Sequence, residues 1–263
     1  MPYENILFEV NNGIGVLTFN RPKALNALNP KTLEEVSEVV DRVRSLDAIR
    51  VLVLTGAGEK AFVAGADISE FPKMNPLQAR IFAEKGQEVF FKLEQLPKPV
   101  IACVNGFALG GGCEIAMSCD FIYAAENARF GQPEVNLGLL PGFGGTQRLA
   151  RLVGRSVAKE LCMTGDMIDA RQAKEIGLVT RVFPAERLVE ETMKIATTLA
   201  SKGPAVLRSI KQVINRGMDV DLRSACALEA EAFGVSFAGS DAKEGVSAFL
   251  EKRKPEFTGS LDS

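Results

Sequence analysis

Histidine is absent from this chain of 263 residues. Its absence excludes a Ser-His-Asp triad, a Cys-His pair and a histidine-ligated metal centre. Proton transfer in any active site must therefore use carboxylate, lysine, tyrosine or cysteine side chains. We expect a site that contains no metal ion.

An excess of charge is also absent, because 31 basic and 33 acidic residues give a net charge of −2. This balance argues against a nucleic-acid partner and against a general attraction to membrane surfaces. No run approaches the roughly 18 apolar residues of a membrane-spanning helix, and the first residues lack the basic region of a signal peptide. The five cysteines are odd in number and scattered through mostly apolar runs, which is typical of free core thiols in a reducing compartment. We expect a cytoplasmic protein.

The apolar pattern predicts an α/β fold. Alternating segments around Asn11-Asn12-Gly13 indicate a hairpin with strands at residues 6–10 and 15–20. Continuous apolar runs indicate strands of a largely parallel sheet, covered on both faces, at residues 51–54 and 100–104. A further strand is expected at residues 121–124. Helical spacing, with Asn29 as the cap of the first helix, predicts helices at residues 30–46, 76–96, 146–153, 156–162 and 170–176.

The strand signal stops at about Pro184. Four helical segments are expected beyond it, at residues 186–201, 205–217, 222–237 and 242–252. We therefore expect an α/β core over residues 1–184 and a helical region over residues 185–263. The apolar positions of this region suit packing on its own sheet or on a neighbouring subunit.

Three consecutive glycines occur in Gly106-Phe-Ala-Leu-Gly-Gly-Gly-Cys-Glu114, ahead of a short apolar helix. Glycine is unfavourable in a helix by roughly 0.5–1 kcal/mol relative to alanine, so a close approach or an unusual backbone conformation must require it. Unpaired N–H groups at a helix N-terminus can hold a developing oxyanion. The small-residue loop Ala64-Gly-Ala-Asp-Ile68 also follows an expected strand, so its amides and those of the glycines can point at one position.

Two glutamates are candidates for acid-base chemistry. Glu114 lies in the first turn of the glycine helix, where a purely structural carboxylate is the alternative. Glu134 lies in a loop bounded by proline and glycine, where an exposed glutamate is the commoner case. Cys113 has no histidine to activate it, and we interpret the cysteines as core residues. The sequence Gly56-Ala-Gly58-Glu-Lys-Ala61 fails as a dinucleotide fingerprint, because it opens no helix.

Together, Ala64-Gly-Ala-Asp67, Asn105-Gly-Phe-Ala-Leu-Gly-Gly-Gly-Cys-Glu114, Phe130-Gly-Gln-Pro-Glu134 and Pro141-Gly-Phe-Gly-Gly-Thr-Gln-Arg148 resemble the crotonase (enoyl-CoA hydratase/isomerase) superfamily. The likeness runs from the loop at residues 21–26 to residues 244–253. It implies an α/β fold, a crotonase-like spiral of ββα units with a helical C-terminal trimerisation region, and a trimer or a hexamer built as a dimer of trimers.

The resemblance also implies roles for individual residues. The amides of Ala66 and Gly111 would form an oxyanion hole for an acyl-CoA thioester, and Glu114 and Glu134 would be the catalytic pair. Both glutamates are retained, as in the family's hydratases. The CoA moiety would contact Lys23, Ala24, Leu25, Ala64, Asp67, Ile68 and, from a neighbouring subunit, Lys252. Residues of the acyl pocket, some of them contributed by a neighbour, would be Leu140, Phe143, Phe233 and Phe249.

Water addition to an unsaturated thioester needs a base at Cβ, an acid at Cα and stabilisation of the enolate between them. By resemblance, Glu114 activates the water and Glu134 delivers the proton, with no cofactor beyond the CoA of the substrate. The chain has Ser69 where several hydratases carry a lysine toward the CoA phosphates. An isomerase, a pathway-specific lyase and a non-catalytic or RNA-binding protein of the same fold remain alternatives.

Overall fold

The computed structural model describes residues 3–259. Its larger sheet has six strands in the order β1-β2-β3-β5-β7-β10. The first two strands form the expected antiparallel hairpin, and the others run parallel. Their bounds are β1 Ile6–Asn11, β2 Ile14–Phe19, β3 Val51–Gly56, β5 Val100–Val104, β7 Phe121–Ala125 and β10 Arg181–Phe183.

A second sheet has four short strands in the order β4-β6-β8-β9. The first three run parallel and the last is antiparallel to β8. Their bounds are β4 Ala61–Ala64, β6 Phe107–Leu109, β8 Arg129–Gly131 and β9 Met167–Asp169.

The chain alternates between the two sheets. After the hairpin and α1 (Pro30–Ser45), β3 and β4 precede α2 (Pro76–Glu94), and β5 and β6 precede α3 (Gly111–Met117). Each of these turns places one strand in each sheet before its helix, so the expected spiral of ββα units is confirmed. Next come α4 (Gly145–Val153), α5 (Arg155–Thr164) and α6 (Ala170–Glu175). Short 3₁₀ helices occur at η1 Pro22–Ala24, η2 Ile68–Lys73, η3 Pro133–Leu137 and η4 Ala185–Arg187.

The core lies on both faces of the larger sheet. Leu52 and Leu54 of β3 join the cluster that contains the apolar face of α1, whereas Val51 and Val53 pack with α7 (Leu188–Ala200). Alternate residues of one strand therefore face opposite helical layers, as expected for a continuous apolar run. None of the helices in residues 3–259 has the length and apolarity that a membrane crossing requires.

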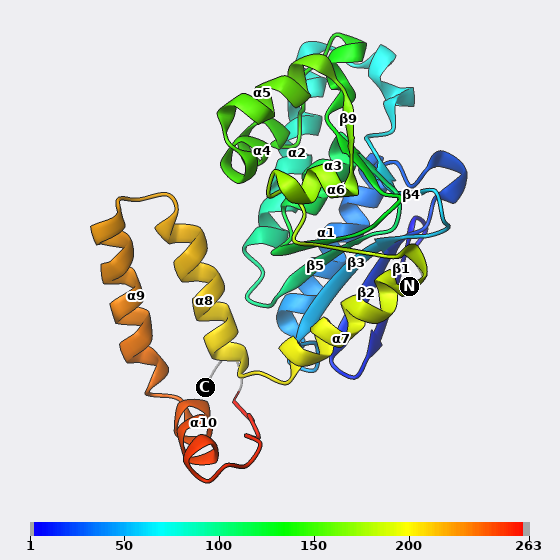
Figure 1. Cartoon of the computed structure of the whole chain (residues 1–263). Helices are drawn as coiled ribbons and strands as arrows, with labels where there is room; N and C mark the ends of the chain where they lie inside the picture. The colour runs from blue at the N-terminus through cyan, green and yellow to red at the C-terminus, as the bar shows by residue number, and fades with distance from the viewer. Residues whose placement is uncertain (1–2, 260–263) are drawn as a thin grey trace.

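The last three helices project from this body (Figure 1). They are α8 (Pro204–Gly217), α9 (Leu222–Ser236) and α10 (Ser240–Leu250), and we call them the C-terminal arm. In Figure 1, α8 and α9 lie side by side and α10 lies beyond their ends. The predicted division at residue 184 assigns α7 to the helical region, although α7 packs on the larger sheet. The division into two regions stays a prediction.

The predicted helices agree with the structure to within about two residues at most ends, and Asn29 caps α1 by accepting the N–H of Thr32. The strands β4, β6, β8, β9 and β10 were not expected, because three or four residues are too few to show alternation. The interpretation of every cysteine as a core residue is wrong. Cys103 and Cys113 are buried, but Cys119 and Cys162 are partly exposed and Cys226 is exposed on the C-terminal arm.

Candidate active site

The candidate site lies where three neighbouring parallel strands end. β4, β6 and β8 are adjacent in the smaller sheet. Ala66 follows β4, Gly111 follows β6 and Glu134 follows β8 within three residues of each strand end. Because the carboxyl ends of parallel strands share one edge of a sheet, this topology brings together three segments that are far apart in the sequence.

The backbone amides of Ala66 and Gly111 donate to no group within residues 3–259. Ala66 forms an isolated parallel bridge with Leu28, in which Leu28 N donates to Gly65 O at 2.9 Å and Asp67 N donates to Leu28 O at 2.8 Å. This bridge uses the neighbours of Ala66 and leaves its own N–H unpaired. Gly111 is the first residue of α3, where a helical N–H has no acceptor within the helix. Both N–H groups are therefore free to bind an oxygen.

The structure explains two of the three consecutive glycines by packing within the protein. A Cβ on Gly110, whose φ is +49°, would lie 2.6 Å from Glu134 Oε1. A Cβ on Gly112 would lie 1.8 Å from the carbonyl oxygen of Val63 in β4. At Gly111, in contrast, a Cβ would come no closer than 3.3 Å to its neighbours. Gly110 thus makes room for a glutamate and Gly112 for a strand, which the sequence analysis had not distinguished.

Glu114 is buried in the first turn of α3, with 1% of its surface exposed. Its Oε1 accepts hydrogen bonds from the N–H groups of Phe143 at 2.8 Å and Gly145 at 2.7 Å. No group within the described residues donates to Oε2. The carboxylate is therefore held through one oxygen, and the other remains an unused acceptor.

The environment of Glu114 shifts its ionisation toward neutral pH. Burial raises its pKa to about 7, and the negative charge of Glu134 adds to the rise. The N–H groups of Gly145 and Phe143 and the positive charge of Arg148 act in the opposite direction. A carboxyl group whose pKa lies near neutrality can both accept and donate a proton.

Glu134 lies in the first turn of η3 and is partly buried. Burial raises its pKa as well. The fully buried side chain of Gln132, oriented with its amide nitrogen toward Glu134, donates to the two carboxylate oxygens at 3.2 and 3.3 Å. Both glutamates also raise the pKa of the Cys113 thiol, after the larger effect of burial. The structure therefore brings the two predicted carboxylates close enough to interact electrostatically, and it leaves Cys113 unsuited to act as a nucleophile.

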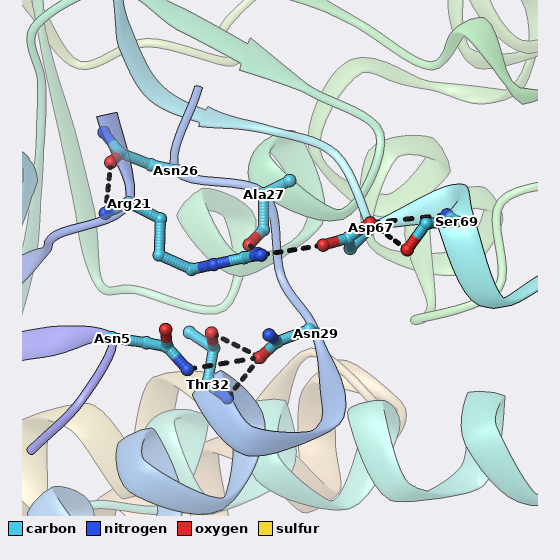
Figure 2. Close-up of polar contacts among 8 residues, drawn as sticks. All are labelled: Asn5, Arg21, Asn26, Ala27, Asn29, Thr32, Asp67 and Ser69. Carbon is cyan, nitrogen blue, oxygen red and sulfur yellow. Dashed lines mark hydrogen bonds and ion pairs between the residues drawn. The ribbon is translucent and has the colours of Figure 1, made fainter. Parts of the chain in front are cut away.

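A polar network holds the loop before α1 against the segment that carries Ala66 (Figure 2). Arg21 pairs with Asp67 at 2.8 Å and donates to the carbonyl oxygen of Ala27. The buried Asn26 accepts the N–H of Arg21 and donates to two carbonyl oxygens between β3 and β4. Asp67 also accepts from the N–H and hydroxyl of Ser69, and Arg21 is the largest cause that holds its pKa below the usual value. These contacts fix the backbone that presents the Ala66 amide.

The family model described as enoyl-CoA hydratase/isomerase matches residues 9–260 of this chain. The chain belongs to the enoyl-CoA hydratase/isomerase family. It is 53% identical to a protein named crotonyl-CoA hydratase from Syntrophomonas wolfei, over 98% of this chain and 99% of that protein. It is 52% identical to a short-chain-enoyl-CoA hydratase from Clostridium acetobutylicum, over 97% of this chain and 98% of that protein.

The fold agrees with solved structures of the family. The crystal structure of an enoyl-CoA hydratase from Bacillus anthracis superposes with a TM-score of 0.94 at 42% identity, covering 97% of this chain and all of that one. An enoyl-CoA hydratase structure from Geobacillus kaustophilus gives a TM-score of 0.95 at 36% identity, covering 98% of each chain. The crotonase-like fold expected from the sequence is confirmed.

The segment that the family resemblance assigns to the CoA moiety lines a cleft of about 390 Å³. Lys23 and Leu25 contribute one wall, and residues 57–61 contribute the other. The left-handed backbone at Leu25, with φ of +50°, turns the chain at this wall. Ala64 donates its N–H to Leu25 O, and the carboxylate of Asp67 is paired with Arg21 within the chain. Ala24 lies in η1 and Ile68 is half exposed at the start of η2.

The remaining predicted residues divide into two groups. Phe143 is buried, and its ring packs against Phe82 and Phe90 beside the position a Cβ on Gly111 would occupy. Four others are exposed, three of them on the C-terminal arm or at its end: Leu140, Phe233, Phe249 and Lys252. Phe233, Phe249 and Lys252 lie far from the glutamates in the sequence, whereas Leu140 lies six residues after Glu134 with an exposed side chain. The roles predicted for these four residues stay predictions.

Sequence reasoning gave no role to Arg21, Asn26, Gln132 or Arg148, although each contacts a segment of the site. Their signal was only that they occur inside the motifs that carry the family resemblance. The role of a buried polar residue can be assigned only when its hydrogen-bond partners are known. No group of three metal-binding side chains is arranged to hold a cation among residues 3–259.

Proposed function

We propose that this chain is a short-chain enoyl-CoA hydratase, which adds water reversibly and with syn geometry to 2-enoyl-CoA thioesters such as crotonyl-CoA. The product is the 3-hydroxyacyl-CoA thioester. The observation that carries the proposal is the proximity of Glu114 and Glu134 at the edge where the Ala66 and Gly111 amides are unpaired. The names of the relatives from S. wolfei and C. acetobutylicum support the substrate class.

In the proposed mechanism the thioester carbonyl accepts hydrogen bonds from the N–H groups of Ala66 and Gly111. Charge that develops on this oxygen as the enolate forms is stabilised by donors already in position. The unused Oε2 of Glu114 accepts a proton from the water that attacks Cβ. Glu134 gives its proton to Cα, so one proton moves onto the protein as another leaves it.

The reactive form of the site contains one proton shared between two carboxyl groups. Burial raises the pKa of each group, and ionisation of one disfavours ionisation of the other. The two groups therefore titrate as a pair, and the singly protonated pair extends over a range of pH. Hydration needs this form because it has both a base and an acid.

The proposal extends to the parts of the substrate and assembly that lie beyond the two glutamates. The CoA moiety lies along the cleft at Lys23 and Leu25, and Lys252 of a neighbouring subunit binds a phosphate. The enzyme is a trimer or a hexamer and acts in the cytoplasm, a location that suits its five free thiols. The reaction transfers only the elements of water and uses no metal or redox cofactor.

The decisive experiment follows the absorbance of the conjugated thioester while purified protein is mixed with crotonyl-CoA. The wild type should remove the band, and Glu114→Gln and Glu134→Gln should each lower kcat by about 10²–10⁴-fold, because each removes a general acid or base. Binding of the product analogue butyryl-CoA is measured in parallel. Retained binding with lost turnover in both variants supports the assignment of roles.

Two results would contradict the proposal. Conversion of a 3-enoyl-CoA without incorporation of labelled water would make the chain an isomerase. Binding to RNA, with neither CoA-thioester binding nor turnover, would support the non-catalytic alternative.

A further inference from the structure

Arg148 of α4 lies behind the loop that holds Glu114. Its Nη1 donates to the carbonyl oxygen of Phe143 at 2.7 Å. The N–H of the same residue, Phe143, donates to Glu114 Oε1 at 2.8 Å. One residue of the loop thus connects the guanidinium to the carboxylate.

The loop is shaped around the guanidinium. Gly144 has a φ of +101°, and a Cβ at this position would lie 2.3 Å from Arg148 Nη1. Gly145, the next residue, gives the second N–H to Glu114, and a Cβ there would lie 2.9 Å from Glu114 Oε1. Both glycines are required for the chain to pass between the arginine and the glutamate.

Arg148 is itself held from α2. Glu94 accepts a bidentate pair of hydrogen bonds, from Nε at 2.7 Å and from Nη2 at 3.0 Å. The rings of Phe90 and Phe91 lie 5.9 and 5.1 Å from the guanidinium carbon. Arg148 is only 8% exposed, so its charge is little screened by water, and Glu94 is the carboxylate that neutralises it.

We propose that Arg148 is a positioning residue for Glu114 and that Glu94 sets how much of its positive charge acts on the catalytic pair. The proposal rests on the hydratase function argued above. The ion pair of Arg148 and Glu94 would thus affect catalysis without contact with the proposed substrate or the attacking water.

Several groups face Glu114 from the elements packed around it. Glu134 in η3 and Arg148 in α4 carry charge, and Cys113 in α3 and Cys162 in α5 are thiols whose pKa burial and the two glutamates raise. Arg148 is the cation that lowers the pKa of Glu114. The thiols are neutral at the pH of catalysis, so Glu134, Arg148 and, through Arg148, Glu94 determine the electrostatic balance.

The proposal predicts shifts of opposite sign for the two members of the ion pair. Arg148→Met removes a positive charge and leaves Glu94 ionised, so the carboxyl pair should hold its protons to higher pH. Glu94→Gln leaves the charge of Arg148 without compensation, so the pair should lose its protons at lower pH. The bell-shaped profile of kcat/KM against pH should move by about 0.5–1 pH unit in each direction.

The experiment measures this profile with crotonyl-CoA for the wild type and both variants. Arg148→Lys keeps the charge without the bidentate geometry, so its profile should stay near that of the wild type while kcat falls. Glu84→Gln is the matched control, because Glu84 lies on the same helix as Glu94 but pairs with the exposed Arg80. Its profile should coincide with that of the wild type.

Melting temperatures are recorded for every variant. If Arg148→Met does not fold, Glu94→Gln alone decides the question through the direction of its shift. An active wild type with unmoved profiles, or with both profiles moved in the same direction, would overturn the inference and leave the ion pair a purely structural contact. An inactive wild type would instead remove the proposed function.

Discussion

At the scale of single residues, the site contains a buried carboxylate whose charged form is destabilised by its surroundings. Glu114 has two N–H donors on one oxygen, and yet burial raises its pKa from 4.5 to about 7. The donors therefore compensate for only part of the lost hydration. Functional groups that are kept poorly solvated lower the stability of the protein that carries them.

Stability should consequently depend on pH through Glu114. Because its folded pKa of about 7 exceeds the usual 4.5, the folded state binds more protons between these values and the free energy of unfolding falls as pH rises through this window. Glu114→Gln removes the titration, so at pH 8 the variant should be more stable than the wild type by up to about 2–3 kcal/mol. Denaturant unfolding at pH 5 and pH 8 measures this difference, and a variant less stable than the wild type at both values contradicts it.

Gly110 offers a second test at this scale. In Gly110→Ala the new methyl group would meet Glu134 Oε1, so the carboxylate must move and kcat should fall by about tenfold or more. Gly138→Ala is the control, because Gly138 also has a positive φ, +69°, but a Cβ there meets nothing within 4 Å. Gly138→Ala should lose about 1 kcal/mol to its left-handed backbone. Gly110→Ala should lose more, because its φ of +49° with ψ of −121° lies outside the regions open to L residues. Equal activity in the two variants would show that Gly110 does not position Glu134.

At the scale of elements, the attachment of α8 to the body depends on a nearly buried ion pair. Lys211 pairs with Asp120 at 2.9 Å, and their side chains are 9% and 18% exposed. Lys211 also donates to the carbonyl oxygens of Leu93 and Lys98, while Asp120 accepts the N–H of Val100 at 2.7 Å. The pair thus joins the arm to the end of α2 and the start of β5.

Lys211→Met should destabilise the protein by about 3–5 kcal/mol, because it leaves Asp120 charged and without its cation in a buried position. The double variant Lys211→Met/Asp120→Asn should recover much of this loss, since neither charge remains. Thermal and denaturant unfolding of both single variants and the double variant gives the coupling energy. A double variant whose loss equals the sum of the single losses would exclude the interaction.

At the scale of the whole molecule, the C-terminal arm carries several exposed large apolar side chains. Ile210, Ile214 and Met218 form a stripe on α8 with exposures of 52%, 60% and 80%. Phe233 and Phe249 are 67% and 82% exposed on the other two helices of the arm. Apolar surface of this kind is typical of protein–protein interfaces, and the assembly proposed above would cover it.

Light scattering after size-exclusion chromatography should give the mass of a trimer or a hexamer for the wild type. Ile214→Asp/Met218→Asp should lower this mass, because it places charges in the apolar stripe. Gln212→Asp is the control, since Gln212 is exposed on the opposite side of the same helix. A monomeric wild type would contradict the proposed assembly.

The sequence alone predicted the features that depend on local patterns. Helical spacing located the long helices, and the continuous apolar runs at β3 and β5 indicated a parallel sheet buried on both faces. The motifs around Glu114 and Glu134 indicated the family, because they combine several residue types that few other folds require. The absence of histidine made carboxylates the main candidates for proton transfer.

Only the tertiary structure decided how these pieces meet. The strands β6 and β8 have three residues each, too few for a periodic signal, yet their register places the site segments at one edge of a sheet. The reason why a glycine is needed at each position depends on the atom that a side chain there would meet. This atom is Glu134 Oε1 at Gly110 and Val63 O at Gly112. The sequence also contained no indication of the electrostatic effect of Arg148 on Glu114. This effect depends on burial and on Glu94, which lies 54 residues before Arg148 in the chain. Sequence patterns reflect residues that are neighbours along the chain, whereas pKa values and close contacts depend on residues that are neighbours in space.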